Sequence, residues 1–457
     1  MVTEQGRQLH IGLNVLNAGA HTAAWQYGDD PFGFVDIEHY RNIARIAERG
    51  ALDAIFLADG PGLREDPRIR PAQALEPTVV LTALAAETER IGLIATASTT
   101  FNDPYNLARR LSSLDHVSRG RLGWNAVTTY DPVVAPNFGL PELPGHDDRY
   151  ARAAEFLDVA AKLWDSWQDD ALVGDTRSGL FADADRIHAI EHEGQRFSVR
   201  GALNLSRSPQ GRPVLVQAGS SEHGKDLAAR HAEVVFAAQT TFGAAQQFYA
   251  DLKGRARARG RDPNSLKVLP GIYTIIGSTE EEARRRKAEL DARVDPGPGL
   301  AKLAGQLGVP LESVDPDAPI PEHLLPDKAD FAGSHGFLDA IVRLAREEEL
   351  TARDLVERIG GGHRMLVGSP EQLADGIEHW FRNGAADGFN IMPDVLPSGA
   401  ESFVDHVVPE LRRRGLFRHE YTEATLRGHL GLRRPRSQYE RADRAESAAG
   451  VGAFETS

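Results

Sequence analysis

The chain is predicted to fold as an α/β protein built on a parallel sheet, and three features of its sequence lead to that prediction. Eight short apolar segments recur along the 457 residues, and amphipathic segments separate them. The apolar segments do not alternate between apolar and polar residues, which is typical of strands buried on both faces. Eight such strands can close a barrel, although the same number also fits an open doubly wound sheet.

The predicted strands are short runs rich in Val, Ile, Leu and Ala. They cover residues 10–16, 53–58, 91–99, 121–127, 213–219, 233–238, 268–276 and 387–392. Helix-like segments such as "IEHYRNIARIAERG" lie between them, with apolar residues at the spacing of one helix face: Ile37, Tyr40, Ile43, Ala44 and Ala47. Strands separated by helices run parallel, so their carboxyl ends should meet at one edge, where such folds bind ligands.

Two insertions interrupt this alternation within one predicted domain, residues 1–432. Residues 168–212 are polar and contain a hairpin-like segment, "RIHAIEHEGQRFSVRG". Residues 294–335 carry seven prolines, and we expect a lid or binding loop there. The tail, residues 433–457, is charged and rich in small residues, which predicts disorder or a segment that wraps a neighbouring subunit.

Composition excludes several classes of function. The net charge is −14, from 66 acidic and 52 basic residues, which argues against a nucleic-acid partner. The chain has no cysteine, so disulfides, thiolate nucleophiles and Cys-ligated metals are excluded. The first residues lack the pattern of a secretory signal, and no run nears eighteen apolar residues. We therefore expect a cytoplasmic protein without a membrane segment.

Polar side chains gather where the predicted strands end. Asp59 follows the second strand, and Thr96 and Ser98 end the third, where both point to the same side. Asn125 lies in the fourth strand, which runs into hydroxyl side chains that include Tyr130. One such ending means little, but several at the same edge predict a polar pocket.

The segment after the first strand adds three candidates for this pocket, namely Asn17, His21 and Trp25. His21 is one of the few acid–base groups that a cysteine-free pocket offers, although a lone histidine is more often a structural hydrogen-bonding group. We expect Asn17 and Trp25 to line the substrate pocket.

The sequence "GSSEHGKD" at 219–226 follows a predicted strand, opens a helix and nearly spells a phosphate loop. Asp226 stands where the magnesium-holding hydroxyl belongs, and its charge would repel a triphosphate. Free amides at a helix start, with Ser220 and Ser221, are still compatible with some phosphate, although a plain helix N-cap is the more common meaning of this pattern alone. No G-x-G-x-x-G occurs, so a Rossmann dinucleotide site is not expected.

Two further segments contain histidines. "HAIEH" at 188–192 matches a zinc signature, but it is predicted to be a strand, where positions four apart lie about 13 Å from each other. No metal site is therefore predicted. "GHDDRYARAAEFL" begins a helix in which His146 and Tyr150 share a face, and Asp147 or Asp148 is the predicted cap.

Together these motifs resemble a known family. "SLDHVSRGRLGWNAVTT", "HDDRYARAAEFLDVAAKLWDSW" and "PVLVQAGSSEHGKDLAARHAEVVF" are similar to nitrilotriacetate and dibenzothiophene-sulfone monooxygenases, which are bacterial-luciferase-like enzymes, over about residues 8–432. The resemblance implies a (β/α)8 TIM barrel with insertions that binds FMN at the carboxyl ends of its strands. It also implies a monooxygenase that depends on FMNH₂ and O₂, with the FMNH₂ supplied by a separate NAD(P)H:flavin reductase. We expect the monooxygenase to be a homodimer or homotetramer.

Matching motifs carry the family's cofactor residues onto this chain. Around the flavin ring and ribityl chain the resemblance implies Asp59, Thr96, Ser98 and Asn125. At the ribityl and phosphate end it implies His146, Tyr150, Ser220 and Ser221. Where some relatives have a histidine this chain has Tyr130. Either Tyr130 donates the proton instead, or the substrate differs from theirs.

The substrate is left open between organosulfur compounds such as sulfones, aminopolycarboxylates and similar xenobiotics. Two other functions fit the same barrel: a deazaflavin-dependent oxidoreductase, and a flavin-binding protein without turnover.

Overall fold

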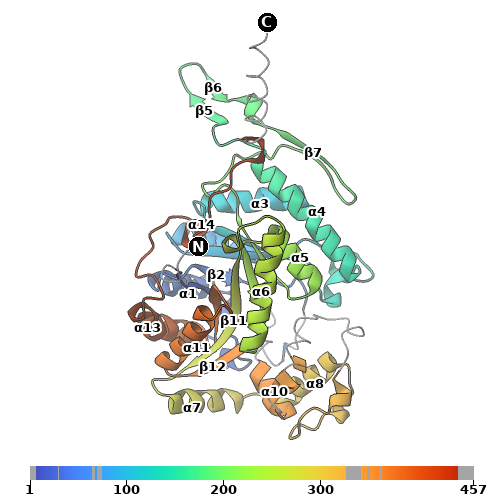
Figure 1. Cartoon of the computed structure of the whole chain (residues 1–457), viewed down its shortest axis with the longest axis vertical. Coiled ribbons are helices and arrows are strands. Elements are labelled where there is room, and N and C mark those ends of the chain that lie inside the picture. The colour runs from blue at the N-terminus through green and yellow to red at the C-terminus, as the bar shows by residue number, and fades with distance from the viewer. Residues whose placement is uncertain are drawn as a thin grey trace.

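Eight parallel strands close into a barrel in the computed structural model (Figure 1), which confirms the predicted fold. In order around the barrel they are β1 (His10–Asn14), β2 (Ala54–Leu57), β3 (Gly92–Ser98), β4 (Leu122–Val127), β9 (Val214–Ala218), β10 (Val234–Ala237), β11 (Lys267–Ile276) and β13 (Gly388–Pro393). The barrel closes because β10 pairs with β11 as well as β9, and β13 pairs with both β11 and β1. The structure describes residues 7–440 except 29, 64–66, 69–70, 72–74, 326–340, 343, 347–349 and 360–362.

All eight predicted strands are present, with small differences at their ends. The first ends at Asn14 rather than at residue 16. A further strand, β12 (Arg364–Gly368), was not predicted; it pairs with the carboxyl-terminal half of β11. β11 is ten residues long, and its second half extends beyond its pairing with β10. β12 therefore covers an edge that the longer strand would otherwise leave unpaired.

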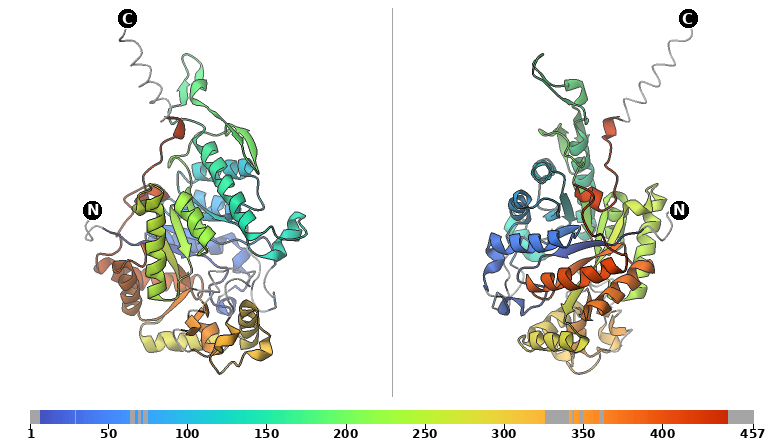
Figure 2. Two further views of the ribbon diagram at one scale, coloured as in Figure 1. Left: turned by 45° about the vertical axis from the view of Figure 1, so that its right-hand side comes forward. Right: turned by 90° about the vertical axis from the view of Figure 1, so that its left-hand side faces the viewer.

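Helices surround the barrel, as Figures 1 and 2 show. The helices next to the barrel are α1 (Ile37–Arg49), α2 (Pro77–Glu87), α3 (Pro104–Val117), α4 (His146–Asp165), α5 (Glu222–His231), α6 (Phe242–Ala258), α7 (Glu280–Asp291), α11 (Pro370–Arg382), α12 (Ser398–Ser402) and α13 (Val408–Arg413). Side-chain oxygens fix several starts; Asp36 caps α1, and Asp103 caps α3 just before Pro104. No helix in the described part of the chain is both long and apolar enough to cross a membrane.

The amino-terminal end of the barrel is filled with apolar side chains. Phe56, Ile94 and Val216 point inward there and pack against Leu426 of α14 (Leu426–His429). Gly92 permits this approach, because a Cβ at its position would lie 2.5 Å from a methyl carbon of Leu426. Alternate residues of a strand point to the same side, so the polar residues that follow along the same strands face the interior at the carboxyl end.

The first insertion forms two antiparallel hairpins, and its predicted hairpin is confirmed. β5 (Leu172–Asp175) pairs with β6 (Leu180–Ala182), and β7 (Ala189–Glu193) pairs with β8 (Ser198–Gly201). In Figure 1 β5 and β6 project at the top, whereas β7 lies alongside α4, which it contacts. The histidines of "HAIEH" do not meet; His188 stacks on Tyr439 at 4.2 Å, whereas His192 faces Glu155 at 3.2 Å.

The start of the tail packs on its own chain rather than extending away from it. Arg434 forms an ion pair with Asp169 and donates a hydrogen bond to the carbonyl oxygen of Pro209 at 3.0 Å. Ser437 Oγ donates to the carbonyl oxygen of Asp165 at 2.9 Å. Residues 441–457 lie outside the described residues, so disorder or subunit wrapping of that part stays a prediction.

The second insertion is not the loop that its prolines suggested. α8 (Pro296–Leu307) packs with α10 (Ala352–Ile359) around a small core of its own. Asp295 caps α8, and a proline in the first helical turn costs no hydrogen bond because that N–H has no partner in the helix. Gly308, at φ +72°, ends it in the left-handed region. Residues 326–335 lie outside the described residues, and a lid role stays a prediction.

Candidate functional site

The carboxyl ends of β3 and β4 place predicted residues side by side inside the barrel. Thr96 and Asn125 are register partners on the two strands, and Asn125 Nδ2 donates to Thr96 Oγ1 at 2.9 Å. Asn125 is 3% exposed, and its Oδ1 has no hydrogen-bond partner among the described residues. Ser98 Oγ accepts from the Thr100 amide at 3.1 Å. A buried acceptor without a partner is costly, which indicates that something else satisfies it.

The turn after β4 is strained. Thr129 has a φ of 46°, which β-branched residues rarely adopt, and its Oγ1 donates to Ser98 Oγ at 2.8 Å. Asn17, past the end of β1, has a φ of 45°. Backbone strain of this kind gathers at functional sites. Beyond the strained turn Tyr130 is 46% exposed, so it lies on the rim of the barrel, and its proposed proton donation stays a prediction.

His21, which follows β1, contacts its own loop and the end of α7 through its two ring nitrogens. His21 Nδ1 accepts from the Ala23 amide at 3.1 Å, and His21 Nε2 lies 3.1 Å from Asp291 Oδ1 at the end of α7. Both ring nitrogens of this candidate acid–base group are thus engaged. Burial acts to raise the pKa of Asp291, but hydrogen bonds from His21 and Lys287 hold it below its usual value.

Asn17, Trp25 and Asp59 lie near the same end of the barrel. Asn17 Nδ2 donates to the Pro71 carbonyl oxygen at 2.9 Å, which connects the β1 loop to the β2 loop. Trp25 is half-buried in that first loop, and Asp59 is half-buried just past β2. These positions are consistent with a ligand at this end, but their roles in binding stay predictions.

The first turns of α4 and α5 face each other beside the end of β9. α5 has Ser221 as its N-cap, whose Oγ accepts from the Gly224 amide at 3.1 Å. Ser221 Oγ also donates to Tyr150 Oη on α4 at 3.4 Å. The prediction that Asp147 or Asp148 caps α4 is wrong, because the N-cap is Gly145 and both carboxylates lie in the first turn. Carboxylates there are favourable next to the positive end of the helix dipole.

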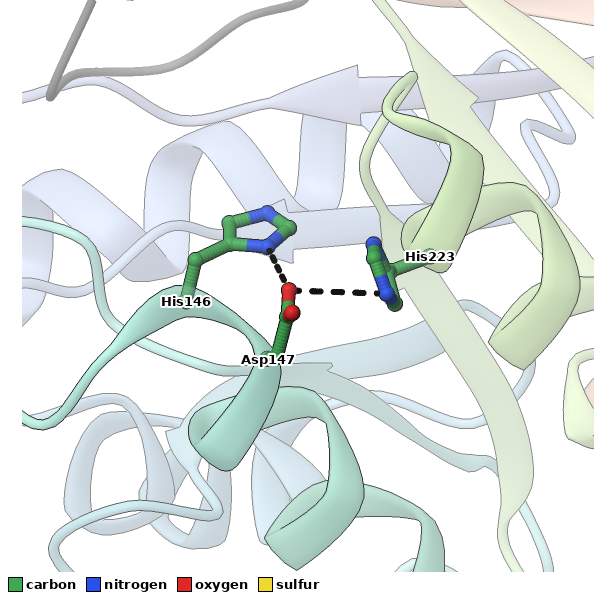
Figure 3. Close-up of side chains that lie close together, drawn as sticks. All are labelled: His146, Asp147 and His223. Carbon is green, nitrogen blue, oxygen red and sulfur yellow. Dashed lines mark hydrogen bonds and ion pairs between the residues drawn. The ribbon is translucent and has the colours of Figure 1, made fainter.

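Three side chains meet between these helix starts (Figure 3). Asp147 Oδ1 lies 3.2 Å from His146 Nδ1 and 3.5 Å from His223 Nε2. The His146 ring lies 4.8 Å from Tyr150, which confirms the predicted shared face, and 5.1 Å from His223. The hydrogen bond from His146 and the charge of His223 lower the pKa of Asp147. His223 was missed as a site residue, although it lies within the motif "GSSEHG".

A tight backbone approach precedes the two predicted serines. A Cβ on Gly219 would lie 2.7 Å from Gln217 Nε2 and 3.3 Å from Tyr150 Oη. Gln217 is 3% exposed, and its Oε1 has no hydrogen-bond partner among the described residues. Backbone amides at a helix start and neutral hydroxyls form a donor set that suits a phosphate group.

Sequence reasoning also missed His363, which follows the second insertion. Its ring stacks on Phe236 of β10 at 5.0 Å, and a Cβ on Gly271 would lie 2.4 Å from His363 Nδ1. Burial lowers the pKa of His363 to about 4, so the imidazole inside the barrel is neutral at physiological pH. The sequence around it, "GGGHRM", matches no complete binding motif, so it gives no local signal of a site.

The site thus has two zones at one end of the barrel. Neutral polar groups on β3 and β4 suit the polar edge of a ligand ring whose face packs on the apolar side chains inside the barrel. The paired starts of α4 and α5 suit a phosphate.

Comparisons with known proteins agree with this arrangement. A family model described as luciferase-like monooxygenase matches residues 13–387. Nitrilotriacetate monooxygenase component A of Aminobacter aminovorans is 46% identical, over 94% of this chain and 98% of its own. Dibenzothiophene-sulfone monooxygenase of Rhodococcus erythropolis strain XP is 40% identical, over 95% and 99%. The crystal structure of a riboflavin lyase with modified FMN and riboflavin has a TM-score of 0.81 at 35% identity, over 93% and 96%.

Proposed function

The chain belongs to the luciferase-like monooxygenase family and is a monooxygenase, and on that premise we propose that it uses FMNH₂ and O₂ to oxygenate a small organic substrate. The observation that carries the FMN assignment is the tight start of α5, next to the polar residues of β3 and β4. We call Gly219, Ser220 and Ser221, with Tyr150 of α4 beside them, the cradle at Gly219. The riboflavin lyase structure, which contains modified FMN, supports the same class of cofactor.

A flavin suits the polar residues at this end of the barrel. We assign Asp59, Thr96, Ser98 and Asn125 to the ring and ribityl chain, and the partnerless Oδ1 of Asn125 is an acceptor that a flavin N–H or hydroxyl can satisfy. At the phosphate end we assign the group His146, Tyr150, Ser220 and Ser221. The reduced flavin, when bound, supplies the activation of oxygen.

The protein's own contribution is to bind, orient and exclude water. The apolar floor around Phe56 and Ile94 gives the ring a dry surface, and the hydroxyls and amide of β3 and β4 fix its polar edge. The second insertion, with α8 in its described part, is assigned the role of a lid that keeps water out during turnover.

The named relatives indicate a range of substrate classes rather than one substrate. One acts on nitrilotriacetate and another on dibenzothiophene sulfone. We therefore propose a xenobiotic of the organosulfur or aminopolycarboxylate type, with Asn17 and Trp25 lining its pocket. We further propose that a separate NAD(P)H:flavin reductase delivers the FMNH₂, as the name "component A" of one relative suggests, and that the oxygenase is a cytoplasmic homodimer or homotetramer.

Oxygen consumption with photoreduced FMN tests this function. Anaerobically photoreduced FMN is mixed with the protein, oxygen and a panel of sulfones, thioethers and aminopolycarboxylates, and products are identified by mass after reaction in ¹⁸O₂. We expect ¹⁸O in the product of at least one substrate class. Substrate reduction with a reduced deazaflavin and no oxygen uptake would instead identify a hydride-transferring enzyme, and tight flavin binding without any product would identify a binding protein.

Tyr130 is assigned the role of proton donor at the rim. Tyr130→Phe keeps the ring and removes only the hydroxyl, so we expect turnover to fall by about 10²-fold, in the range for a lost proton donor. The affinity for FMN should stay within about twofold of the wild type, because the flavin contacts on β3 and β4 are untouched. Full turnover by the variant at saturating FMNH₂ would leave Tyr130 as a packing residue of the rim.

A further inference from the structure

Large apolar side chains lie exposed on two loops at the carboxyl end of the barrel. Leu63 follows β2 and is 61% exposed, and Val133 and Phe138 follow β4 and are each 45% exposed. Single exposed apolar residues are common, but a continuous group of them marks a place where something binds. We call Leu63, Val133 and Phe138 the apolar patch.

Contacts between loops hold the patch together as one surface. The loop after β2 packs on the 3₁₀ helix η4 (Pro132–Phe138), because a Cβ on Gly62 would lie 3.1 Å from Val133 Cγ1. At the other end of η4 the Phe138 ring stacks on Phe101, from the loop after β3, with the ring centroids 4.5 Å apart. The exposed side chains therefore belong to a surface that three neighbouring loops build.

This surface lies above the part of the barrel assigned to the flavin ring. Thr100 Oγ1 donates to the Thr128 carbonyl oxygen at 2.7 Å, so the loops after β3 and β4 run together beyond Thr96 and Asn125. Tyr130, the assigned proton donor, comes directly before η4 in the chain. A substrate that approaches a flavin at the ends of β3 and β4 therefore passes these loops.

The loops at this end of the barrel carry more negative than positive charge. Residues 15–36, after β1, contain three acidic residues and no Lys or Arg, and residues 128–145, after β4, contain two acidic residues and no Lys or Arg. Residues 58–76, after β2, contain three arginines against four acidic residues. A free polycarboxylate needs several cationic partners, because a desolvated carboxylate without one is costly.

Two arginines that reach these loops are engaged with the protein itself. Arg152 of α4 donates to the carbonyl oxygens of Thr99 and Asn102, both at 3.1 Å. Arg286 of α7 forms an ion pair with Asp394, just past β13. Their guanidinium groups hold loops in place, and binding of a substrate carboxylate would have to compete with these contacts.

We infer that Leu63, Val133 and Phe138 select an uncharged, largely apolar substrate and that the surrounding loops disfavour free polycarboxylates. This inference rests on the proposed function, because it takes the flavin at the ends of β3 and β4 as the place of reaction. Of the two substrate classes proposed above it selects the organosulfur class, since thioethers and sulfones carry no net charge. Contact with the patch removes apolar surface from water, whereas the acidic loops repel a carboxylate.

Two aryl methyl sulfides of nearly the same shape test the charge selection. 4-(Methylthio)benzamide is uncharged, and 4-(methylthio)benzoate is an anion at neutral pH. Each is titrated calorimetrically into the FMN-loaded protein, and oxygen transfer from FMNH₂ is followed by mass. We expect the amide to bind at least about tenfold more tightly than the benzoate. Equal or tighter binding of the benzoate, or binding of neither compound, overturns the inference.

A charged variant tests whether the patch sets this preference. Val133→Arg places a cation on the patch and should reduce the preference for the amide by about two- to fivefold, the range of an exposed ion pair. Val117→Arg is the matched control, because Val117 is also half-exposed but ends α3 at the opposite end of the barrel, and the preference should not change. An unchanged preference in Val133→Arg overturns the inference.

An apolar truncation tests the contact itself. Phe138→Ala removes part of the patch and should weaken the amide by about fivefold. Phe181→Ala, an exposed ring on β6 of the first insertion, is the matched control and should leave the affinity unchanged. If Phe138→Ala changes the molecular mass in solution and leaves both affinities unchanged, the patch is a contact between subunits and the inference is wrong.

The failures of the two proposals can be told apart. Preferential binding of the amide without oxygen transfer from FMNH₂ to any compound overturns the proposed function and leaves the patch standing. Oxygenation of the benzoate or of nitrilotriacetate as efficiently as the amide overturns the selection by the patch and leaves the flavin-dependent oxygenation standing.

Discussion

Purified protein given NADH or NADPH, FMN, oxygen and substrate should form no oxygenated product until a flavin reductase or photoreduced FMN is added. The physical reason for this expectation is that the sequence has no G-x-G-x-x-G turn of the kind that holds the pyrophosphate of a nicotinamide cofactor, so we expect a separate protein to deliver the hydride to the flavin. Chromatography measures the amount of oxygenated product. We expect no product above the detection limit until FMNH₂ is supplied.

A control removes the trivial explanation that the preparation is inactive. The same preparation should turn over when an unrelated NADH-dependent flavin reductase is supplied, because diffusible FMNH₂ needs no specific contact with the reductase. Stoichiometric oxidation of NADH coupled to product, by the chain alone, would show that the oxygenase reduces its own flavin. The two-component assignment would then be wrong, while the family membership would stand.

The barrel could be predicted from the sequence because its strands carry a strong local signal. Buried parallel strands are continuous apolar runs, and all eight were found. β12 was missed because its five residues, beginning with Arg364, resemble a loop end, and only the extra length of β11 creates the edge that it covers. α8 was mistaken for a loop because prolines usually break helices, whereas these lie at its start, after the Asp295 cap.

The candidate site also contains some residues that the sequence predicts and others that it does not. Thr96, Ser98 and Asn125 could be grouped because strand alternation and a common edge fix where side chains point. His223 and Asp147 could not be paired, since their meeting depends on how α4 packs against α5, which no local pattern encodes. His363 enters the barrel only after the path of the second insertion is known. His21 was predicted as an acid–base group, but in the structure its ring faces Asp291. Because Asp291 lies on α7, far along the chain, no local pattern predicts this contact.

Removal of two phosphate donors should cause the largest loss of cofactor affinity. The double variant Ser220→Ala with Tyr150→Phe removes two neutral hydroxyls assigned to the phosphate of FMN. Hydrogen bonds to a charged group contribute about 1.5–3 kcal/mol each, so the dissociation constant should rise by about 10² to 10⁴-fold. Ser221 is kept, because its Oγ caps α5 and its loss would destabilise the helix by about 0.5–2 kcal/mol.

Fluorescence titration under anaerobic conditions measures FMN, FMNH₂ and riboflavin against the same variant. Reduced FMN should bind the wild type more tightly than oxidised FMN, and both should weaken in the variant by similar factors, because the phosphate is the same in both. Riboflavin should bind wild type and variant alike. Ser178→Ala, on the β5–β6 turn of the first insertion, is the matched control for loss of a serine hydroxyl. Equal FMN affinity in the double variant and the wild type would mean that the phosphate lies elsewhere, and the cradle at Gly219 would then be only a tight helix start.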